Sequence, residues 1–440
     1  MTASVEANSP PQKGLFYGWW IVMVGVLLMA TIFGTVINSF SLFINPVIAE
    51  LKGISIAAFT LAYTAITLAG IPMSPLVGNL LKKVDARWIV TAGVILAAVA
   101  NVILANAQNV ATIYLAAALQ GIALTAATTI PIASMIVNWF VRLRGTALGI
   151  ATAGSGLGSL IFVPLIKFYL LPGVGWRSTY LVLAVIQVVV LVPLAVLVLR
   201  NTPEQKGLKP LGWEEAALLD VHGATEQHPG LTQRQVYRTP AFWLLAVALI
   251  FSGISVNGMV ANLDPILGAL NSPVVVAGFI LSTIGLFVMA GKFITGILFD
   301  KLPLMVAIII VSLANAVQFA FMLSPSSITS GALFGFLHGF GATMVTVTPA
   351  YLASKLFGER DYSAVYGSVS VFALGGAALA PIFGGFFYGG ATTSDNNHAT
   401  SLVWAWLVMG LIGLGFYIVT VLSKPKWEVQ DAPFAGPVRT

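Results

Sequence analysis

Twelve apolar segments, each long enough to cross a lipid bilayer, constrain the fold of this chain more than any other feature. A membrane-spanning helix needs about 20 apolar residues, and in hydrocarbon its backbone groups must be hydrogen-bonded within the segment. Charged, Pro and Gly clusters separate segments near 16–44, 55–81, 87–106, 110–139, 145–170, 177–199, 241–268, 274–299, 302–323, 329–357, 363–389 and 400–422. The pattern predicts an all-α membrane protein with twelve transmembrane helices.

Composition excludes several other classes of protein. The chain is 58% hydrophobic and 8% charged, with a mean hydropathy of +0.94, which is unlike any soluble domain. It has no cysteine, so disulfides, thiolate metal ligands and cysteine nucleophiles are ruled out. Its apolar segments carry no paired acids, histidine clusters or Ser/His/Asp sets, so we expect neither an enzyme nor a metal or cofactor. A ligand-sensing receptor would need a signalling domain, which the tails and linker are too short to supply.

The basic residues fall mainly on one side of the predicted membrane. With the N-terminus inside, 17 of the 21 Lys and Arg residues lie in segments that face the cytoplasm; the others are Lys52, Lys167, Arg177 and Lys292. Cytoplasmic loops carry such an excess of positive charge. We therefore expect a multi-pass protein of the plasma membrane (in a bacterium, the inner membrane) with both termini cytoplasmic. The net charge of +6 needs no nucleic-acid partner.

An internal repeat divides the chain into two halves. At an offset of 218 residues the sequence matches itself at Gly78/Gly296, Lys83/Lys301, Gly121/Gly339, Thr125/Thr343, Thr128/Thr346, Pro131/Pro349 and Gly149/Gly367. Parallel repeats of this kind are typical of transporters with a midplane site. The predicted organisation is a cytoplasmic N-terminal tail (1–15), an N-terminal six-helix half (16–199), a cytoplasmic linker (200–239), a C-terminal six-helix half (240–422) and a cytoplasmic C-terminal tail (423–440).

Several short motifs carry a family resemblance over nearly the whole chain. They are YGWWIV (Tyr17–Val22), RLRGTALGIATAGSGLGSLIFVP (Arg142–Pro164), GWR (Gly175–Arg177) and GILFDK (Gly296–Lys301). The first-half copy of the last motif is GNLLKK (Gly78–Lys83), which has Lys82 at the position equivalent to Asp300. These segments resemble the major facilitator superfamily, and within it the monocarboxylate and oxalate–formate porters. The resemblance implies two pseudo-symmetric six-helix halves (the major facilitator fold), alternating access and a monomer.

Lys292 is the strongest candidate for a functional residue. It lies in the apolar run GFILSTIGLFVMAGKFITGILFD with no acid within one helical turn. A cation near the bilayer centre costs about 2.5–3.5 kcal/mol and usually faces a cavity or a partner, so the missing counter-ion suggests an anionic substrate. In the resembling family a basic residue here, usually Arg, binds the substrate carboxylate. Proton-coupled members often pair this residue with an Asp one turn earlier, where this chain has Val288, and the oxalate–formate type has a second basic residue in the eleventh helix, where this chain has Ala373. A single intramembrane cation favours a monoanion over a dianion. A snorkelling or structurally paired lysine is the alternative.

Other polar residues at membrane depth are weaker candidates. As hydrogen-bond partners of the substrate we expect Asn38, Asn257, Tyr63, His338, Thr125 and Ser155, with interhelical bonding or packing as the alternative. For proton coupling the candidates are His338, which can titrate near neutral pH, and Asp264, whose position before a proline also fits a helix end. As cytoplasmic gate or structural contacts to helix ends we expect Asp300, Lys301, Arg142 and Arg144.

The sequence thus predicts a secondary active transporter of a small organic anion, foremost a monocarboxylate, whose carboxylate pairs with Lys292. A proton is a candidate co-substrate. Two alternatives stay open: an anion exchanger without proton coupling, and a carrier of a neutral solute or drug in which Lys292 is structural.

Overall fold

The described part of the chain is helical. The computed structural model describes residues 15–51, 54–213, 230–323, 325–388 and 396–425, and its only β pairings there are isolated bridges. Most of both predicted tails and the middle of the predicted linker lie outside these residues. The first half comprises α1 (Gly18–Leu28), η1 (Met29–Asn38), η2 (Phe40–Phe43), α2 (Ile44–Glu50), α3 (Ile56–Leu80), α4 (Ala86–Ala105), α5 (Val110–Ala127), α6 (Thr129–Trp139), α7 (Arg144–Pro164), η3 (Leu165–Leu170), α8 (Leu171–Ile186), η4 (Gln187–Leu191) and α9 (Val192–Val198).

The linker and the second half continue the helical pattern. They comprise η5 (Pro203–Lys206), α11 (Gln233–Val236), α12 (Pro240–Ala269), α13 (Val274–Lys301), α14 (Leu304–Met322), α15 (Ile328–Gly341), η6 (Ala342–Val345), α16 (Val347–Phe357), α17 (Tyr362–Tyr388) and α18 (Asn396–Leu422). The elements η1, η3 and η4 are π-helical, whereas η2, η5 and η6 are 3₁₀ turns.

The predicted twelve crossings are confirmed. Eleven helical runs in the described residues are long and apolar enough to span a membrane, and one of them, 144–198, is 55 residues long. That run reverses direction near Gly175, whose φ of +75° interrupts the helix. Its two ends lie together, because Arg144 donates to the carbonyl of Phe140 while the neighbouring Trp139 donates to the carbonyl of Arg200. The run therefore crosses the membrane twice.

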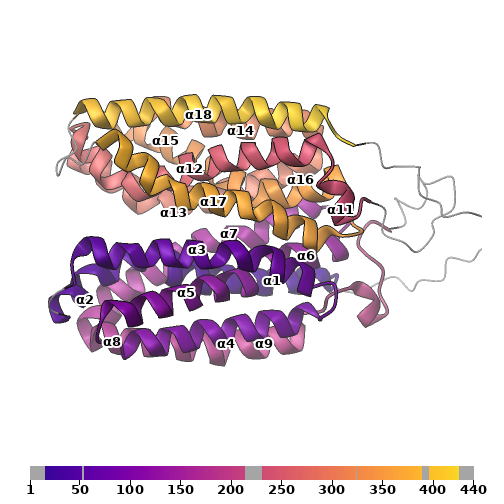
Figure 1. The fold of residues 1–440 in the computed structure, drawn as a ribbon, viewed down its shortest axis with the longest axis horizontal. Helices are drawn as coiled ribbons and strands as arrows, with labels where there is room; N and C mark the ends of the chain where they lie inside the picture. The colour runs from indigo at the N-terminus through magenta and orange to yellow at the C-terminus, as the bar shows by residue number, and fades with distance from the viewer. Residues whose placement is uncertain (1–14, 52–53, 214–229, 324, 389–395, 426–440) are drawn as a thin grey trace, which may run out of the picture.

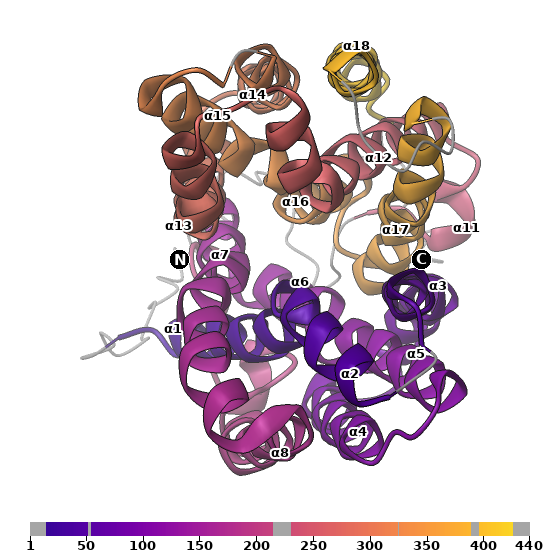
Figure 2. The same ribbon diagram turned by 90° about the vertical axis from the view of Figure 1, so that its left-hand side faces the viewer.

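The helices form two halves, drawn one above the other in Figure 1. The start of α1, the end of α18 and the linker helix α11 lie at one end of the molecule, which we call the tail side; the opposite end is the far side (Figure 1). Seen from the far side, the halves meet along two helix pairs, α7 with α13 and α3 with α17 (Figure 2). Large apolar side chains face outward, among them Trp20 and Met23, each more than half exposed, as a lipid-facing surface requires.

Glycines of the internal repeat place the two halves in close contact. A Cβ at Gly149 would lie 2.6 Å from the carbonyl oxygen of Lys292 and 3.0 Å from the Cα of Gly296. At the equivalent place, a Cβ at Gly367 would lie 2.5 Å from the carbonyl oxygen of Ser74 and 3.2 Å from the Cα of Gly78. Residues related by the repeat thus make related contacts, and only glycine allows backbones to approach so closely.

Each half contains one helical segment that is broken about two-thirds of the way along, in 110–139 and in 328–357. Thr128 separates α5 from α6 with φ −120° and ψ −106°, and Thr346 separates η6 from α16 with φ −128° and ψ −72°. Pro131 and Pro349 follow three residues later. A proline has no N–H and clashes with the carbonyl four residues earlier, so it breaks a helix just before itself. The two breaks therefore lie at positions that the internal repeat relates.

Candidate functional site

Lys292 lies buried in the contact between the two halves. Its side chain is only 3% exposed. The Nζ atom donates to the Ser155 hydroxyl oxygen at 2.7 Å and lies 3.5 Å from the carbonyl oxygen of Thr152, both on α7 of the other half. Lys292 forms none of the ion pairs found among the described residues. Its ammonium group is therefore hydrogen-bonded, but its charge has no described counter-ion.

Asn38 joins the same cluster from the end of η1. Its Nδ2 atom donates to the carbonyl oxygen of Ser155 at 2.9 Å, so Ser155 accepts from Asn38 with its backbone and from Lys292 with its hydroxyl. Three of the predicted substrate-binding residues, from the first, fifth and eighth crossings, thus meet at one place. We call Asn38, Ser155 and Lys292 the lysine cluster.

A cavity of about 130 Å³ lies between the halves, and we call it the inter-half cavity. None of its fifteen described lining residues is charged, and eight are polar; they are Phe33, Ser74, Leu124, Thr125, Thr128, Thr129, Ile130, Asn257, Val345, Thr346, Tyr366, Ser370, Ala373, Leu374 and Ala377. Lys292 is not among them. Phe33, however, belongs to the same short π-helical element as Asn38 and lies five residues before it. Element η1 therefore connects this inter-half cavity to the lysine cluster.

Of the four remaining substrate-binding candidates, Asn257 and Thr125 line the inter-half cavity, whereas Tyr63 and His338 do not. The Nδ2 atom of Asn257 donates to the carbonyl oxygen of Gly253 at 2.9 Å, and the Thr125 hydroxyl donates to that of Gly121 at 3.0 Å. Tyr63 is not among the lining residues, and its ring packs edge-on against Phe40 with centroids 5.6 Å apart.

His338 belongs to a polar chain inside the C-terminal half. Its Nδ1 atom lies 2.9 Å from the Oε1 atom of Gln318, whose Nε2 atom donates to the Oδ1 atom of Asn315 at 2.8 Å. The ring is 1% exposed and parallel to that of Phe334. Helix α15 packs against the helix of Lys292 through Gly291 and Gly339. The side chain of Asp264, the other proton-coupling candidate, lies outside what the structure describes.

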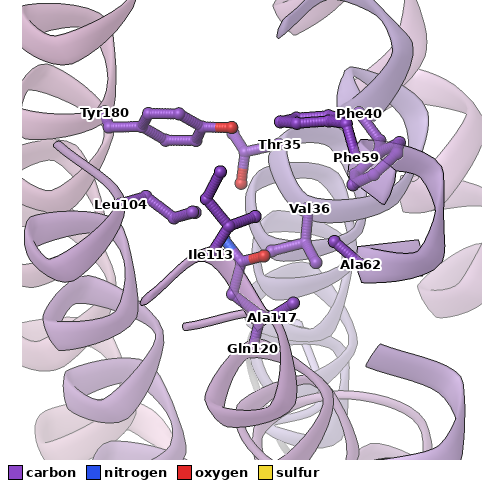
Figure 3. A pocket seen from close by; sticks show the side chains of 10 residues that line it. All are labelled: Thr35, Val36, Phe40, Phe59, Ala62, Leu104, Ile113, Ala117, Gln120 and Tyr180. Carbon is purple, nitrogen blue, oxygen red and sulfur yellow. The ribbon is translucent and has the colours of Figure 1, made fainter. Parts of the chain in front are cut away.

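The N-terminal half has a corresponding buried polar chain. Gln120 donates to Asn101 at 2.9 Å, Asn101 to Gln187 at 3.0 Å, and Gln187 to the Thr35 hydroxyl at 3.2 Å. Gln120 and Thr35 also border a small void of about 10 Å³, toward which the Tyr180 hydroxyl points (Figure 3). That volume is about the size of one water molecule. The chain joins α5, α4, η4 and η1 into one unit.

Asp300 connects the halves on the tail side. Its two carboxylate oxygens accept from the backbone N–H groups of Gly145 and Thr146, at 2.7 and 2.6 Å. These groups belong to the first turn of α7, where unpaired N–H groups and the helix dipole favour a negative charge. A carboxylate of the C-terminal half therefore caps a helix of the N-terminal half.

The equivalent contact on the other helix pair has its charges exchanged. Lys82 occupies the position of Asp300 in the first repeat, and its Nζ atom lies 2.9 Å from Asp361, the residue before α17. Partial burial alone would raise the pKa of Asp361, but the N–H of Gln233 and the ammonium of Lys82 outweigh it and hold that pKa below its usual value. The acid thus stays ionised and paired near neutral pH.

The other predicted gate residues also lie on the tail side. Arg144 is buried, donates to the carbonyl oxygens of Phe140 and Val137, and forms an ion pair with Glu359 of the other half. Arg142 packs against the linker, where its backbone N–H donates to the carbonyl of Leu211 at 2.9 Å. Lys301 is exposed at the end of α13. In this structure, then, ion pairs and a helix cap join the halves on the tail side.

Several residues of this site were missed by reasoning from the sequence. Glu359 and Asp361 sit in a short polar connection and carry no motif that ties them to a partner over 200 residues away. Thr152 contributes only its backbone carbonyl. The broken helices could have been predicted, because Pro131 and Pro349 interrupt two apolar segments at equivalent places.

Comparison with known proteins identifies the class of protein to which this fold and site belong. The sequence profile of the Major Facilitator Superfamily matches residues 15–381. The chain therefore belongs to this superfamily, whose members are transporters rather than enzymes, as predicted.

Individual relatives cover almost the whole chain at low identity. Monocarboxylate transporter 13 of Rattus norvegicus is 26% identical over 440 residues, covering 98% of this chain and 96% of that protein. The oxalate:formate antiporter of Oxalobacter formigenes is 27% identical over 438 residues, covering 96% and 98%. Among solved structures, the proton:xylose symporter XylE bound to 6-bromo-6-deoxy-D-glucose aligns with a TM-score of 0.69 at 15% identity, covering 91% and 95%. That last likeness supports the fold alone.

Proposed function

We propose that this protein is a secondary active transporter of a small organic monoanion, whose carboxylate binds at the lysine cluster. The observation that carries the proposal is the buried ammonium of Lys292, which lies between the two halves with neutral partners, Ser155 and Thr152. A buried charge without a counter-ion is strongly unfavourable, and a carboxylate supplied by the substrate would neutralise it. The names of the two relatives, a monocarboxylate transporter and an oxalate:formate antiporter, agree with a carboxylate substrate.

The inter-half cavity supports a small substrate over a drug-sized one. Its volume of about 130 Å³ is below the roughly 300–1,000 Å³ of pockets that bind drug-sized ligands. Its lining residues are uncharged, so a second carboxylate would find no described cation there. A monocarboxylate with its charge at Lys292 and the rest of its structure in the cavity fits both observations.

The location of Lys292 suggests how binding and closure are coupled. The residue lies where α13 packs on α7, and these helices must separate or slide when the halves rock. An unpaired ammonium resists enclosure in a dry interface, whereas a paired one does not. The substrate carboxylate would therefore permit the conformational change, which gives obligatory coupling or exchange without a dedicated acid. We further propose that the tail side is the cytoplasmic side, in accord with its basic residues.

Uptake of labelled organic acids into proteoliposomes tests the lysine cluster directly. We expect Lys292→Ala to abolish saturable uptake of monocarboxylates, while Lys167→Ala, which alters an exposed lysine outside the interface, leaves it intact. Lys292→Arg shows whether the site needs the compact charge of an ammonium group or also accepts a planar guanidinium group, which binds a carboxylate through two hydrogen bonds. Unchanged saturable uptake by Lys292→Ala would rule out the anion site, and equal uptake of an acid and its amide would favour a neutral-solute carrier.

Proton coupling requires a separate measurement. If a proton moves with the substrate through His338, an imposed pH gradient drives uptake in the wild type, and His338→Gln abolishes this response while counterflow of labelled substrate continues. Uptake that ignores the gradient in both proteins identifies an exchanger. The existing hydrogen bond of His338 to Gln318 makes glutamine the appropriate replacement, because its amide can bond to the same oxygen.

A further inference from the structure

The polar groups of the inter-half cavity offer mainly hydrogen-bond acceptors, because their own hydrogens are already bonded. Five hydroxyl groups in the wall donate to the carbonyl oxygen four residues earlier in their own helix; they belong to Ser74, Thr125, Thr128, Thr346 and Ser370. A hydroxyl has one hydrogen and two lone pairs. Each of these side chains can therefore accept a hydrogen bond from a ligand, but it can donate one only by giving up its bond to the helix.

Other groups in the wall add to this excess of acceptors. The Asn257 amide already donates one hydrogen to Gly253, and its Oδ1 atom is an acceptor. Pro349 has no N–H, so it cannot satisfy the carbonyl of Val345, another lining residue, as a helix would. The remaining side-chain donors are the second amide hydrogen of Asn257 and the hydroxyls of Tyr366 and Thr129, the last of which lies 3.4 Å from the Thr128 hydroxyl oxygen. Acceptors thus outnumber donors among the described lining groups.

From this imbalance, and resting on the proposed carboxylate site, we infer that the inter-half cavity selects substrates whose uncharged part carries hydroxyl groups. The preferred substrates are hydroxy acids, ahead of the keto and unsubstituted acids with the same carbon chain. A ligand hydroxyl supplies the hydrogen that the wall lacks. A keto oxygen supplies one more acceptor, and an unsubstituted chain leaves the wall oxygens without a partner, at a cost. Thr125, Thr346 and Asn257 then select for a hydroxyl group on the substrate, whereas Lys292 selects for its negative charge.

Competing uptake of matched acids tests the inference. The substituent must lie away from the carboxylate to reach the cavity wall, because Lys292 does not line the cavity. 3-Hydroxybutyrate, acetoacetate and butyrate form a four-carbon set of hydroxy, keto and unsubstituted acids, and 5-hydroxyhexanoate, 5-oxohexanoate and hexanoate form a six-carbon set. In at least one set we expect kcat/KM for the hydroxy acid to exceed that of both analogues about tenfold, the factor that corresponds to one additional hydrogen bond. Equal values within both sets, or a preference for the keto acids, would overturn the inference.

Variants show whether the cavity wall causes the preference. Thr125→Val and Thr346→Val keep the shape of the side chain and remove the oxygen, so the ratio of hydroxy to unsubstituted uptake should fall toward one. Thr420→Val is the matched control, because its buried hydroxyl makes the same bond within α18, to Phe416, and does not line the cavity. Thermal unfolding identifies any variant that fails to fold, and Asn257→Leu provides an independent test in that event.

The outcomes separate this inference from the proposed function. If the wild type carries the acids without discrimination and Lys292→Ala does not carry them, the anion site stands and the hydroxyl preference is wrong. A preference that survives in all three cavity variants also contradicts the inference. If the wild type carries none of the acids, both proposals are wrong.

Discussion

At the scale of single residues, Ser155 is as informative as Lys292. Its hydroxyl and its carbonyl accept from residues of two different crossings, Lys292 and Asn38, which lie in opposite halves. The sequence suggested a small polar residue in a glycine-rich helix, but nothing in the sequence links positions 38, 155 and 292. Their meeting depends on how the halves pack.

We predict that Ser155→Ala destabilises the substrate-free protein by about 1.5–3 kcal/mol, the typical worth of a hydrogen bond to a charged group. The ammonium of Lys292 would keep only the carbonyl of Thr152 at 3.5 Å. Thermal unfolding in detergent measures the effect. Ser312→Ala is the control, since its buried hydroxyl bonds only to a methionine sulfur at 3.9 Å; equal destabilisation by the two variants would contradict the assigned role.

At the scale of elements, the two tail-side contacts differ although the repeat relates their positions. Asp300 accepts two backbone hydrogen bonds at the first turn of α7. Lys82 forms an ion pair with Asp361 in which both side chains are between a fifth and a third exposed. A charge-assisted helix cap contributes about 1–2 kcal/mol, whereas exposed ion pairs contribute about 0–1 kcal/mol. We therefore expect the α7–α13 contact to contribute more to tail-side closure.

Asp300→Asn should open the tail side more than Lys82→Gln does. We expect a five- to thirtyfold larger open population for Asp300→Asn, which corresponds to about 1–2 kcal/mol, and less than fivefold for Lys82→Gln. Because the chain has no cysteine, a single cysteine at Ser370 in the cavity can report opening. Its labelling rate with a membrane-impermeant thiol reagent, applied from the tail side, is the measurement. A larger effect of Lys82→Gln would contradict this ranking.

At the scale of the whole molecule, alternating access requires that each half moves as one body. In the N-terminal half the chain Gln120–Asn101–Gln187–Thr35 links four elements deep in the membrane, where unpaired polar groups are costly. The C-terminal half has the shorter chain of His338, Gln318 and Asn315. Such chains resist relative sliding of helices within a half and leave motion to the interface between halves.

Gln187→Leu should lower the free energy of unfolding by about 2–4 kcal/mol, because it leaves two groups, on Asn101 and Thr35, without their partner. Gln108→Leu, at an exposed position, should change it by less than about 0.5 kcal/mol. Both values come from reversible denaturation of the purified protein. Similar small effects for both variants would show that the chain does not stabilise the half.

The sequence by itself determined the class of fold, because membrane-spanning helices need long apolar segments and those segments are visible in one dimension. It also determined the two-half architecture, since repeated glycines, threonines and prolines keep their register, and it singled out Lys292, since a charge in an apolar run stands out without any structure. The helix breaks at Thr128 and Thr346 could also be predicted from the sequence, because a proline follows each of them after three residues.

Only the tertiary structure decided which polar residues meet. It brought Asn38 and Ser155 to Lys292, placed Asn257 and Thr125 in the inter-half cavity and left Tyr63 outside it, and paired Arg144 and Lys82 with acids more than 200 residues away. Hydropathy and local spacing specify that a segment enters the membrane and where it turns. The rotation of each helix about its axis, and hence the partner of each polar side chain, depends on packing between segments distant in sequence.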